Sequence, residues 1–355
     1  MAGWHGEAQD KHLKKKVAVI ATASPSGEAG GAERFYDGLC AALQDQGVDA
    51  SVVPVVADES NFESILRSYL RFYDLDLSQY DGVISTKAPG YVVRHSNHVC
   101  YLQHTMRVFY DMFEVEFPSA SDEMKAQRRR IQILDTAALS SPGLKKLFVI
   151  GEEVRKRLAQ FNGLDAEVLH QATSMSGFRE GPFEYIFMPG RLHRWKRVDL
   201  VIQAMKHVKA PVKLMISGTG EDRQALEELA RDDERITFLG RLTDEQLLDS
   251  YSRALVVPFV PYREDFGLVT VEAFHSGKPV LTCVDSGEPA RLVEKHSAGI
   301  VCEPSPVSIA RAIETLHADR ELARKMGSRG LAAAREVSWS ATATRLLQAL
   351  GIATA

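Results

Sequence analysis

The sequence predicts an α/β protein built from two Rossmann-like domains that face each other across a cleft. Short apolar runs alternate with segments of helical period along most of the chain, as expected for parallel sheets covered by helices. The alternation stops in a polar stretch at residues 171–181 and then starts again, which indicates a linker. At 355 residues the chain is also too long for a single ordinary core.

The position of the apolar runs predicts the elements. In the first half, strands are expected at residues 17–21, 51–56, 81–86, 98–102, 145–150 and 166–170, with helices at 32–47, 62–77, 121–139 and 151–161. In the second half, strands are expected at residues 184–188, 212–217, 236–242, 254–257, 280–284 and 300–303, with helices at 198–208, 268–275, 308–337 and 339–350. Right-handed crossovers place the loops that follow the strands at one edge of each sheet, where ligands bind.

Composition excludes several classes of protein. Apolar residues make up 45% of the chain and charged residues 25%, as in ordinary globular proteins. The formal net charge of −4 gives no pull toward nucleic acid, and neither half is basic, so at most weak peripheral membrane contact is expected. No apolar stretch approaches the roughly 18 residues of a membrane span. Four widely spaced cysteines are typical of reduced thiols in a cytoplasmic protein, and residues 1–15 read as a disordered polar lead-in without a signal core.

The stretch at residues 258–279 carries the most chemistry. An apolar run ends at two prolines, a charged turn with Glu264 follows, and a helix-like segment at residues 268–275 carries Glu272. The N-terminus of such a helix presents free backbone N–H groups and the positive end of its dipole, so it suits a phosphate. Two carboxylates beside that phosphate can accept hydrogen bonds from sugar hydroxyls.

The pair Glu264 and Glu272, with seven residues between, resembles the E-x7-E signature of retaining glycosyltransferases of family 4, which have the GT-B fold. The surrounding residues, EDFG, VEA and then SGKPV, are close to the consensus of that family. The segment G-R-L-x-x-x-K at residues 190–196 and the glycine-rich loop at Gly30 and Gly31 are also similar to family segments. The resemblance covers about residues 15–350 and is best over 185–305.

The resemblance implies roles in the second half of the chain. Glu272 is expected to hold the ribose hydroxyls of a nucleotide-sugar donor, and Glu264 to contact the sugar and stabilise positive charge at its anomeric carbon. Arg191 and Lys196 are expected to bind the donor diphosphate, because a planar fork and a point charge offset the negative charge of the leaving group. Backbone N–H groups at Phe266, Gly267 and Leu268 would assist, and the base would lie near Leu242.

The first half supplies the opposite wall of the cleft. His104 ends a predicted strand, and the run His104-Thr105-Met106-Arg107 resembles an H-T-x-M-R type segment with one residue missing. In the family this histidine lies near the C6 hydroxyl of the donor sugar. The resemblance also implies an acceptor-side domain at residues 16–175, a donor-binding domain at 176–338 and a final helix at 339–352 that crosses back onto the first domain.

The resemblance implies a retaining hexosyltransferase that uses a UDP- or GDP-sugar without a metal or other cofactor. The acceptor would be a sugar, a lipid-linked sugar or a small molecule, in glycan, polysaccharide or glycolipid biosynthesis. A glycoside hydrolase and a non-catalytic nucleotide-sugar-binding protein are the alternatives, since each can also use two carboxylates. A nicotinamide site is disfavoured because the glycines near Gly30 lack the dinucleotide spacing. The D-x-D at Asp74 and Asp76 closes a predicted helix and is a weak candidate for a metal site.

Overall fold

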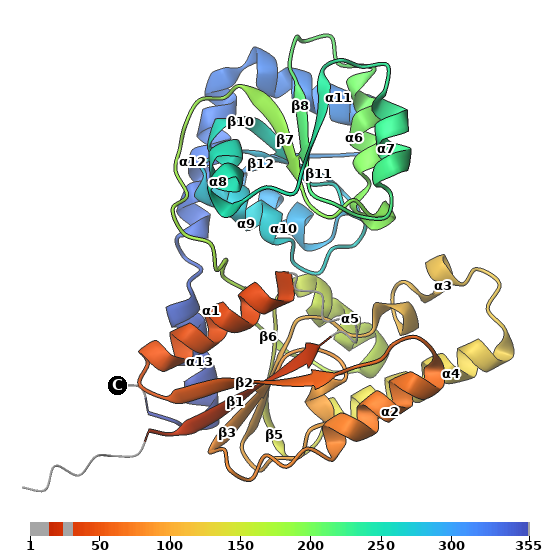
Figure 1. Ribbon diagram of the computed structural model, residues 1–355, viewed down its shortest axis with the longest axis vertical. Helices are drawn as coiled ribbons and strands as arrows, with labels where there is room; N and C mark the ends of the chain where they lie inside the picture. Colours follow the sequence, from red (N-terminus) through yellow and green to blue (C-terminus); the bar gives the residue numbers. More distant parts are fainter. Residues whose placement is uncertain (1–13, 24–30, 354–355) are drawn as a thin grey trace, which may run out of the picture.

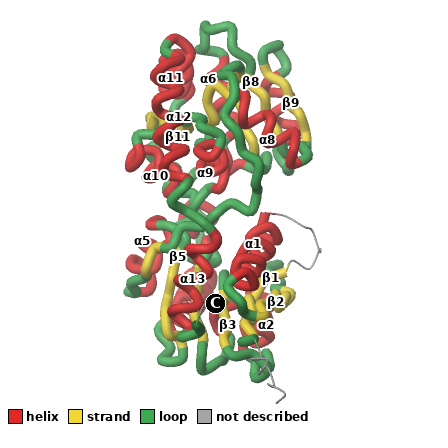
Figure 2. The backbone as a smooth tube through the Cα atoms, turned by 90° about the vertical axis from the view of Figure 1, so that its left-hand side faces the viewer, coloured by secondary structure: helices red, strands yellow, loops and turns green. Residues whose placement is uncertain are grey.

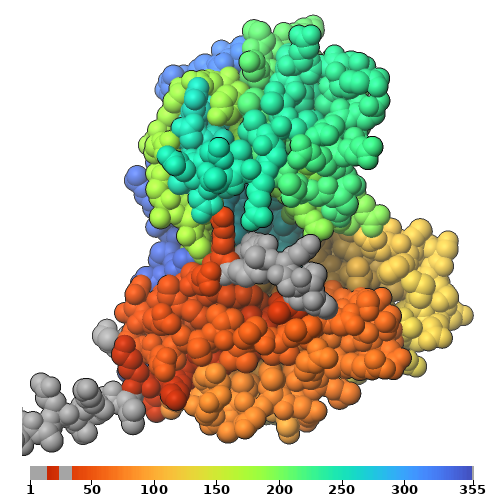
Figure 3. Space-filling view, in the orientation of Figure 1, coloured from red at the N-terminus to blue at the C-terminus, as the bar shows by residue number. Residues whose placement is uncertain are grey.

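The computed structural model describes residues 14–23 and 31–353, which form two lobes stacked along the long axis of the molecule (Figure 1, Figure 3). Each lobe contains a six-stranded sheet, and neighbouring strands within both sheets pair in parallel. The predicted α/β class with two Rossmann-like domains is therefore confirmed. Residues 1–13 of the expected lead-in lie outside the described residues.

The first sheet has the strand order β2-β1-β3-β4-β5-β6. Its strands are β1 (Lys16–Ala23), β2 (Asp49–Val56), β3 (Gly82–Ser85), β4 (His98–Leu102), β5 (Leu144–Val149) and β6 (Glu167–Val168). The helices of this lobe are α1 (Gly31–Asp45), α2 (Phe62–Tyr73), α3 (Phe113–Glu116), α4 (Asp122–Leu139) and α5 (Glu152–Asn162), with 3₁₀ turns η1 (Gly90–Val92) and η2 (Arg107–Phe109).

The second sheet has the strand order β12-β11-β10-β7-β8-β9. Its strands are β7 (Tyr185–Pro189), β8 (Leu214–Ser217), β9 (Ile236–Gly240), β10 (Ala254–Pro258), β11 (Val280–Cys283) and β12 (Gly299–Cys302). The helices that follow in the chain are α6 (Val198–Met205), α7 (Arg223–Ala230), α8 (Asp244–Arg253), α9 (Leu268–His275), α10 (Glu288–His296), α11 (Pro306–Ala318), α12 (Arg320–Ala334) and α13 (Trp339–Leu350), with a 3₁₀ turn η3 (Arg194–Lys196).

Strand β1, between β2 and β3, is buried on both faces, as a parallel sheet requires. Val17 and Val19 belong to the larger core, which includes residues of α1, whereas Ala18 and Ile20 pack with Phe72 of α2. Successive side chains of a strand point to opposite faces, so this alternation places helices on both sides of the sheet. The run of small and branched residues at 17–21 satisfies both packings at once.

The last helix, α13, lies in the first lobe and not beside the second-lobe helices that precede it. Figure 2 shows α13 among the first-lobe strands, and in Figure 1 it lies next to α1. The indole ring of Trp339 packs edge-on against Phe35 of α1, with centroids 5.4 Å apart. Leu346 and Leu347 are completely buried in the core that contains β1. The chain therefore crosses between the lobes twice, near residues 169–184 and near residues 335–338.

Several predicted elements differ from the observed ones. The stretch 308–337 is two helices, because Asp319 ends α11 and its carboxylate accepts the N–H of Leu322 at the start of α12 (2.8 Å). The helix expected at 62–77 ends at Tyr73, and the strand expected at 166–170 is only Glu167–Val168. Helices α7, α8 and α10 were not predicted.

All four cysteines are free thiols, and Cys283 lies opposite Cys302 in the register of β11 and β12. In the D-x-D, the weak candidate for a metal site, Asp74 is the C-cap of α2 and Asp76 accepts the N–H of Ser78 (3.0 Å) in a turn. Within residues 14–23 and 31–353, no group of three or more His, Cys, Asp or Glu side chains forms a metal-binding cluster. Among the helices of that same part of the chain, none combines the length and apolar character needed to cross a bilayer.

Lys278 fixes the connection between the two lobes. Its side chain is completely buried, and Nζ donates hydrogen bonds to the carbonyls of Gly181 (2.8 Å) and Pro182 (2.9 Å). The ammonium also lies 3.7 Å from the centre of the Phe183 ring. Burial lowers the pKa of Lys278 to about 8 from its ordinary value of 10.5. Between these two pH values the unfolded chain binds more protons than the folded chain, so the stability contribution of Lys278 rises with pH.

Lys278→Met should therefore destabilise the protein more at pH 10 than at pH 7. At either pH the variant leaves two carbonyls without donors, a loss of about 1–3 kcal/mol for each. At pH 7 that loss is offset because the variant no longer buries a charge, whereas at pH 10 the offset is small. Urea unfolding at both pH values measures the difference. Lys325→Met, an exposed position on α12, is the matched control, and a destabilisation independent of pH would contradict the argument.

Candidate functional site

Glu264 lies in the loop between β10 and α9, at the carboxyl edge of the second sheet. Backbone hydrogen bonds fix its path: its N–H donates to the carbonyl of Ser286 (3.0 Å), and its own carbonyl accepts the N–H of Glu288 (3.0 Å). These contacts form an isolated parallel bridge between Glu264 and Gly287. The following strand, β11, ends beside β10, so the loop after β11 supplies the partners that residue 264 needs.

Two glycines allow this close approach. Gly287 has φ of +76°, and a Cβ there would lie 2.5 Å from the carbonyl oxygen of Glu264. Gly267, at the N-cap of α9, has φ of +78°, and a Cβ there would lie 2.5 Å from the Phe259 ring. Both positions combine a left-handed backbone with space for no side chain, so another residue would displace the loop that carries Glu264.

Lys196 reaches Glu264 from the loop after β7. Its Nζ lies 2.6 Å from Oε2 of Glu264. Arg191, earlier in the same loop, is 70% exposed, and its guanidinium lies 3.3 Å from Glu221. Of the two predicted cations, Lys196 is thus paired with Glu264, and Arg191 is paired with Glu221 at the surface. A stronger anion can displace Glu221 from Arg191.

Left-handed backbone occurs beside both members of the Lys196–Glu264 pair. Arg197 has φ of +50° and Arg263 has φ of +49°, conformations that cost a non-glycine residue about 1–3 kcal/mol each. The Arg197 guanidinium donates to the Val260 carbonyl (2.7 Å) and forms two bonds to Asp285 (2.8 and 2.7 Å). One side chain therefore ties the loops after β7, β10 and β11 together, and strain concentrated at such a point is typical of functional sites.

Glu272 lies on α9, whereas Glu264 lies in the loop before this helix, and the two carboxylates have different environments. Its Oε2 accepts a hydrogen bond from the hydroxyl of Tyr251 (2.7 Å). Burial raises the pKa of Glu272, and the Tyr251 hydroxyl and the charge of Arg34 on α1 oppose the shift only in part. A carboxyl group in such a place gains from hydrogen-bond donors that arrive with a ligand, such as sugar hydroxyls.

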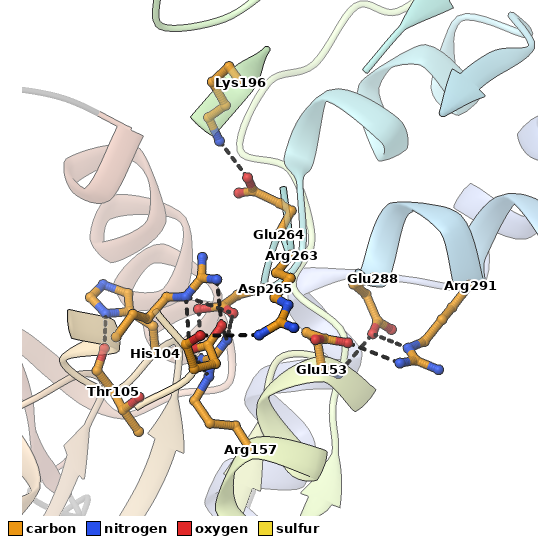
Figure 4. Close-up of polar contacts among 12 residues, drawn as sticks. His104, Thr105, Glu153, Arg157, Lys196, Arg263, Glu264, Asp265, Glu288 and Arg291 are labelled. Carbon is orange, nitrogen blue, oxygen red and sulfur yellow. Dashed lines mark hydrogen bonds and ion pairs between the residues drawn. The ribbon is translucent and has the colours of Figure 1, made fainter. Parts of the chain in front are cut away.

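The first lobe contributes His104, which follows β4. The Nδ1–H of this ring donates to the Thr105 carbonyl (3.0 Å), which leaves Nε2 as an acceptor. Burial lowers the pKa of His104, and the negative charge of Asp265 opposes that shift, so the neutral imidazole is favoured at pH 7. Asp265 belongs to the second lobe, so the two lobes meet at this point (Figure 4).

The structure brings His104, Lys196 and Glu264 into one region, as Figure 4 shows. Phe266 is buried with its ring 5.8 Å from that of His170, so only its backbone can face a ligand. Leu268 begins α9, and Leu242 is half-buried between β9 and α8. Gly31 is the first residue of α1, and Gly30 lies outside the described residues.

Other residues in this region were missed by the sequence reasoning. Arg157 of α5 is almost completely buried and pairs with Asp265, and Arg107 lies 3.9 Å from the same carboxylate. Arg157 could have been found, because it stands beside Val154 and Leu158 on the buried face of α5, where an arginine needs a partner. Tyr251 gave no signal beyond its place at the end of a charged segment.

Comparison with known proteins shows which proteins the chain is similar to. Residues 175–332 match the family model described as "Glycosyl transferases group 1". The chain is 31% identical over 169 residues to a D-inositol 3-phosphate glycosyltransferase of Corynebacterium efficiens, covering 44% of this chain and 40% of that one. It is 28% identical over 166 residues to the human alpha-1,3/1,6-mannosyltransferase ALG2, covering 41% and 39%. The match thus spans about 40% of the length of these relatives.

Solved structures extend the likeness over the whole fold. A sucrose-phosphate synthase from Thermosynechococcus elongatus superposes with a TM-score of 0.73 at 20% identity, covering 94% of this chain and 98% of that one. HepE of Anabaena, solved in complex with UDP and glucose, superposes with a TM-score of 0.72 at 16% identity, covering 95% and 99%. The chain therefore has the GT-B fold, and its residues 175–332 are similar to the group 1 glycosyl transferases.

Proposed function

We propose that this chain is a retaining, metal-independent glycosyltransferase of family 4 that transfers a hexose from a nucleoside-diphosphate sugar to a hydroxyl acceptor. The observation that carries the proposal is the Lys196–Glu264 pair, held at 2.6 Å between strained loops beside the N-terminus of α9. A cation, a carboxylate and a helix N-terminus together suit a sugar joined to a diphosphate. HepE, with the same fold, was solved with UDP and glucose, which supports such a donor.

Each side chain has a role in the proposed reaction. The bond between the anomeric carbon and the diphosphate oxygen breaks, a bond to the acceptor oxygen forms on the same face of the sugar, and the proton of the acceptor hydroxyl passes to the departing diphosphate oxygen. Lys196 and Arg191 offset the negative charge that grows on the diphosphate, with help from the free N–H groups at the start of α9. Glu264 stabilises positive charge at the anomeric carbon, and Glu272 binds the ribose. His104 accepts a hydrogen bond from a hydroxyl of the sugar.

The acceptor in this proposal is a sugar, a lipid-linked sugar or a small molecule, and the pathway is glycan, polysaccharide or glycolipid biosynthesis in the cytoplasm. A donor screen identifies the substrate: UDP, GDP and their hexose conjugates are tested by thermal shift, since a ligand at 100 times its Kd adds about 2.7 kcal/mol of stability. The product formed with an acceptor is then analysed by NMR. An inverted anomeric configuration would contradict the retaining mechanism, and release of free sugar in place of transfer would favour a hydrolase.

Glu272→Ala should weaken donor binding more than it slows the reaction. Ribose hydroxyl contacts exist in the ground state and the transition state alike, so their loss should raise the donor KM about 10-fold or more with a smaller change in kcat. Steady-state kinetics and calorimetric titration with the nucleotide measure both terms. Tyr251→Phe removes only the hydroxyl that orients Glu272 and should give a smaller effect of the same kind. A collapsed kcat at unchanged KM would contradict this role.

Lys196→Ala should lower kcat by about 10²–10³-fold, because the charge acts where negative charge develops in the transition state. Arg191→Ala should lower kcat in the same way with little loss of stability, since Arg191 is exposed and has only Glu221 as its partner among the described residues. Single-turnover rates with saturating donor measure the chemical step. Near-normal rates in both variants would remove the loop after β7 from the mechanism.

Turnover should survive an excess of EDTA. In the proposal the positive charge beside the diphosphate comes from Lys196, Arg191 and the helix N-terminus, so no divalent ion is required. Initial rates before and after chelation, with Mn²⁺ or Mg²⁺ added back, decide the point. Loss of activity that either ion restores would show that a metal is needed.

A further inference from the structure

The residue after Glu264 connects the two lobes. Asp265 belongs to a second-lobe loop, yet its carboxylate is held by Arg157 of α5 in the first lobe, with Nη1 of Arg157 3.2 Å from Oδ2 and Nη2 bonded to Oδ1. The Arg157 side chain is 2% exposed and that of Asp265 12%. A two-bond arginine–carboxylate pair with so little water around it is specific in its geometry and is costly to leave unpaired.

The surroundings of this pair come from three first-lobe segments. Arg157 Nε lies 2.7 Å from Asp111, and Arg107 of η2 lies 2.7 Å from the same carboxylate. Arg107 Nε also lies 3.9 Å from Asp265. His104, which follows β4, helps to lower the pKa of Asp265. The guanidinium groups of Arg157 and Arg107, both in the first lobe, thus lie beside the carboxylates of Asp111 in the same lobe and Asp265 in the second lobe. Figure 4 labels Arg157 and Asp265 among these residues.

Helix α5, which carries Arg157, also contacts the residue that holds the backbone of Glu264. Glu288, whose N–H bonds the carbonyl of Glu264, turns its own carboxylate to the N-terminus of α5 and accepts the N–H of Glu153 (3.1 Å). Arg291 of α10 pairs with the Glu153 side chain at 3.0 Å. Helix α5 therefore contacts the residue that follows Glu264 and the residue that anchors its backbone, and both contacts exist only when the lobes are together.

We propose that Arg157 is a positioning residue for sugar transfer: it holds Asp265 across the lobe interface and so fixes Glu264 where the donor sugar binds. The proposal rests on the function proposed above. A lysine cannot replace the arginine, because one ammonium cannot bond both oxygens of Asp265 and reach Asp111 in the same plane. The site is then complete only in the closed arrangement of the lobes, which ties transfer to closure.

The charges around Asp265 predict how kcat depends on pH if Arg157 has the proposed role. Burial alone would raise the pKa of Asp265, but the charges of Arg157 and then Arg107 outweigh it and hold the pKa below its ordinary value. Removing Arg157 leaves burial opposed only by Arg107 and His104, so the pKa of Asp265 should rise. The acid limb of the kcat profile should therefore move to higher pH in Arg157→Gln, since a protonated Asp265 also loses its attraction to Arg107.

Four variants test the positioning role: Arg157→Gln, Arg157→Lys, Asp265→Asn and the double variant Arg157→Gln/Asp265→Asn. Arg157→Gln should lower kcat about 100-fold at nearly unchanged donor KM, as expected for a misplaced catalytic group. Arg157→Lys should recover only part of that loss. The double variant removes the uncompensated charge, so it should regain thermal stability but not kcat. Arg155→Gln, on the same helix with a side chain 42% exposed, is the matched control and should behave as wild type.

Wild-type kcat in Arg157→Gln would overturn the proposal, and so would a double variant that regains kcat together with stability. Hydrogen exchange of residues 262–267 and small-angle scattering give a readout that needs no substrate. Both should show a looser loop and a more open molecule in Arg157→Gln, and unchanged exchange and scattering would count against the proposal. Absence of sugar transfer by the wild type would defeat the proposed function alone, because these two measurements still test the contact between the lobes.

Discussion

Glu264 lies in a loop without helix or strand of its own, and three backbone hydrogen bonds to the next loop decide its path. The N–H groups of Arg263 and Glu264 donate to residues 285 and 286, and the carbonyl of Glu264 accepts from residue 288. These bonds form because β10 and β11 are neighbouring parallel strands that end at the same edge. The geometry of the candidate site thus depends on strand order, with Gly287 allowing the two backbones to touch.

The ion pairs between the lobes are unequal. The Arg34–Asp244 pair has both side chains exposed to water, and the Arg291–Glu153 pair is only partly buried. Pairs of this kind contribute little because water solvates both partners when they separate. The Arg157–Asp265 pair is shielded, so each partner loses more when the other is absent. The lobe interface can be mostly polar and still have one arrangement of low energy, because one buried contact outweighs several exposed ones.

The sequence predicted best where several local signals coincided. Helices 268–275 and 339–350 were predicted with the observed bounds, since a glycine follows each one closely and marks its end. The break at Asp319 was missed because a carboxylate inside a long helical pattern was not read as a cap. Helix α8 was also missed, although Thr243 and Gln246 form a capping box that the sequence displays.

The site residues also divide into those with a local sequence signal and those without one. Glu264, Glu272 and Lys196 could be predicted because they belong to short segments with fixed spacing. Arg157 carried a signal in its place beside Val154 and Leu158, but only the structure identifies Asp265 as its partner. Asp111 and Tyr251 could not be predicted, since each comes from a separate part of the chain and only the packed structure brings it to the site. The outward turn of Arg191 toward Glu221 has no sequence signal either, because it depends on where the loop after β8 lies.

The position of α13 has a consequence for the order in which the molecule is made. Ribosomal synthesis runs from the N-terminus, so the second lobe, whose sheet ends at Cys302, has all its strands before α13 emerges. The first lobe is translated earlier, but the surface that Leu346, Leu347 and Leu350 bury stays open until residues 339–350 leave the ribosome. A nascent chain that stalls before residue 339 would therefore hold a nearly finished second lobe and an exposed apolar face on the first, the part that began to fold earlier.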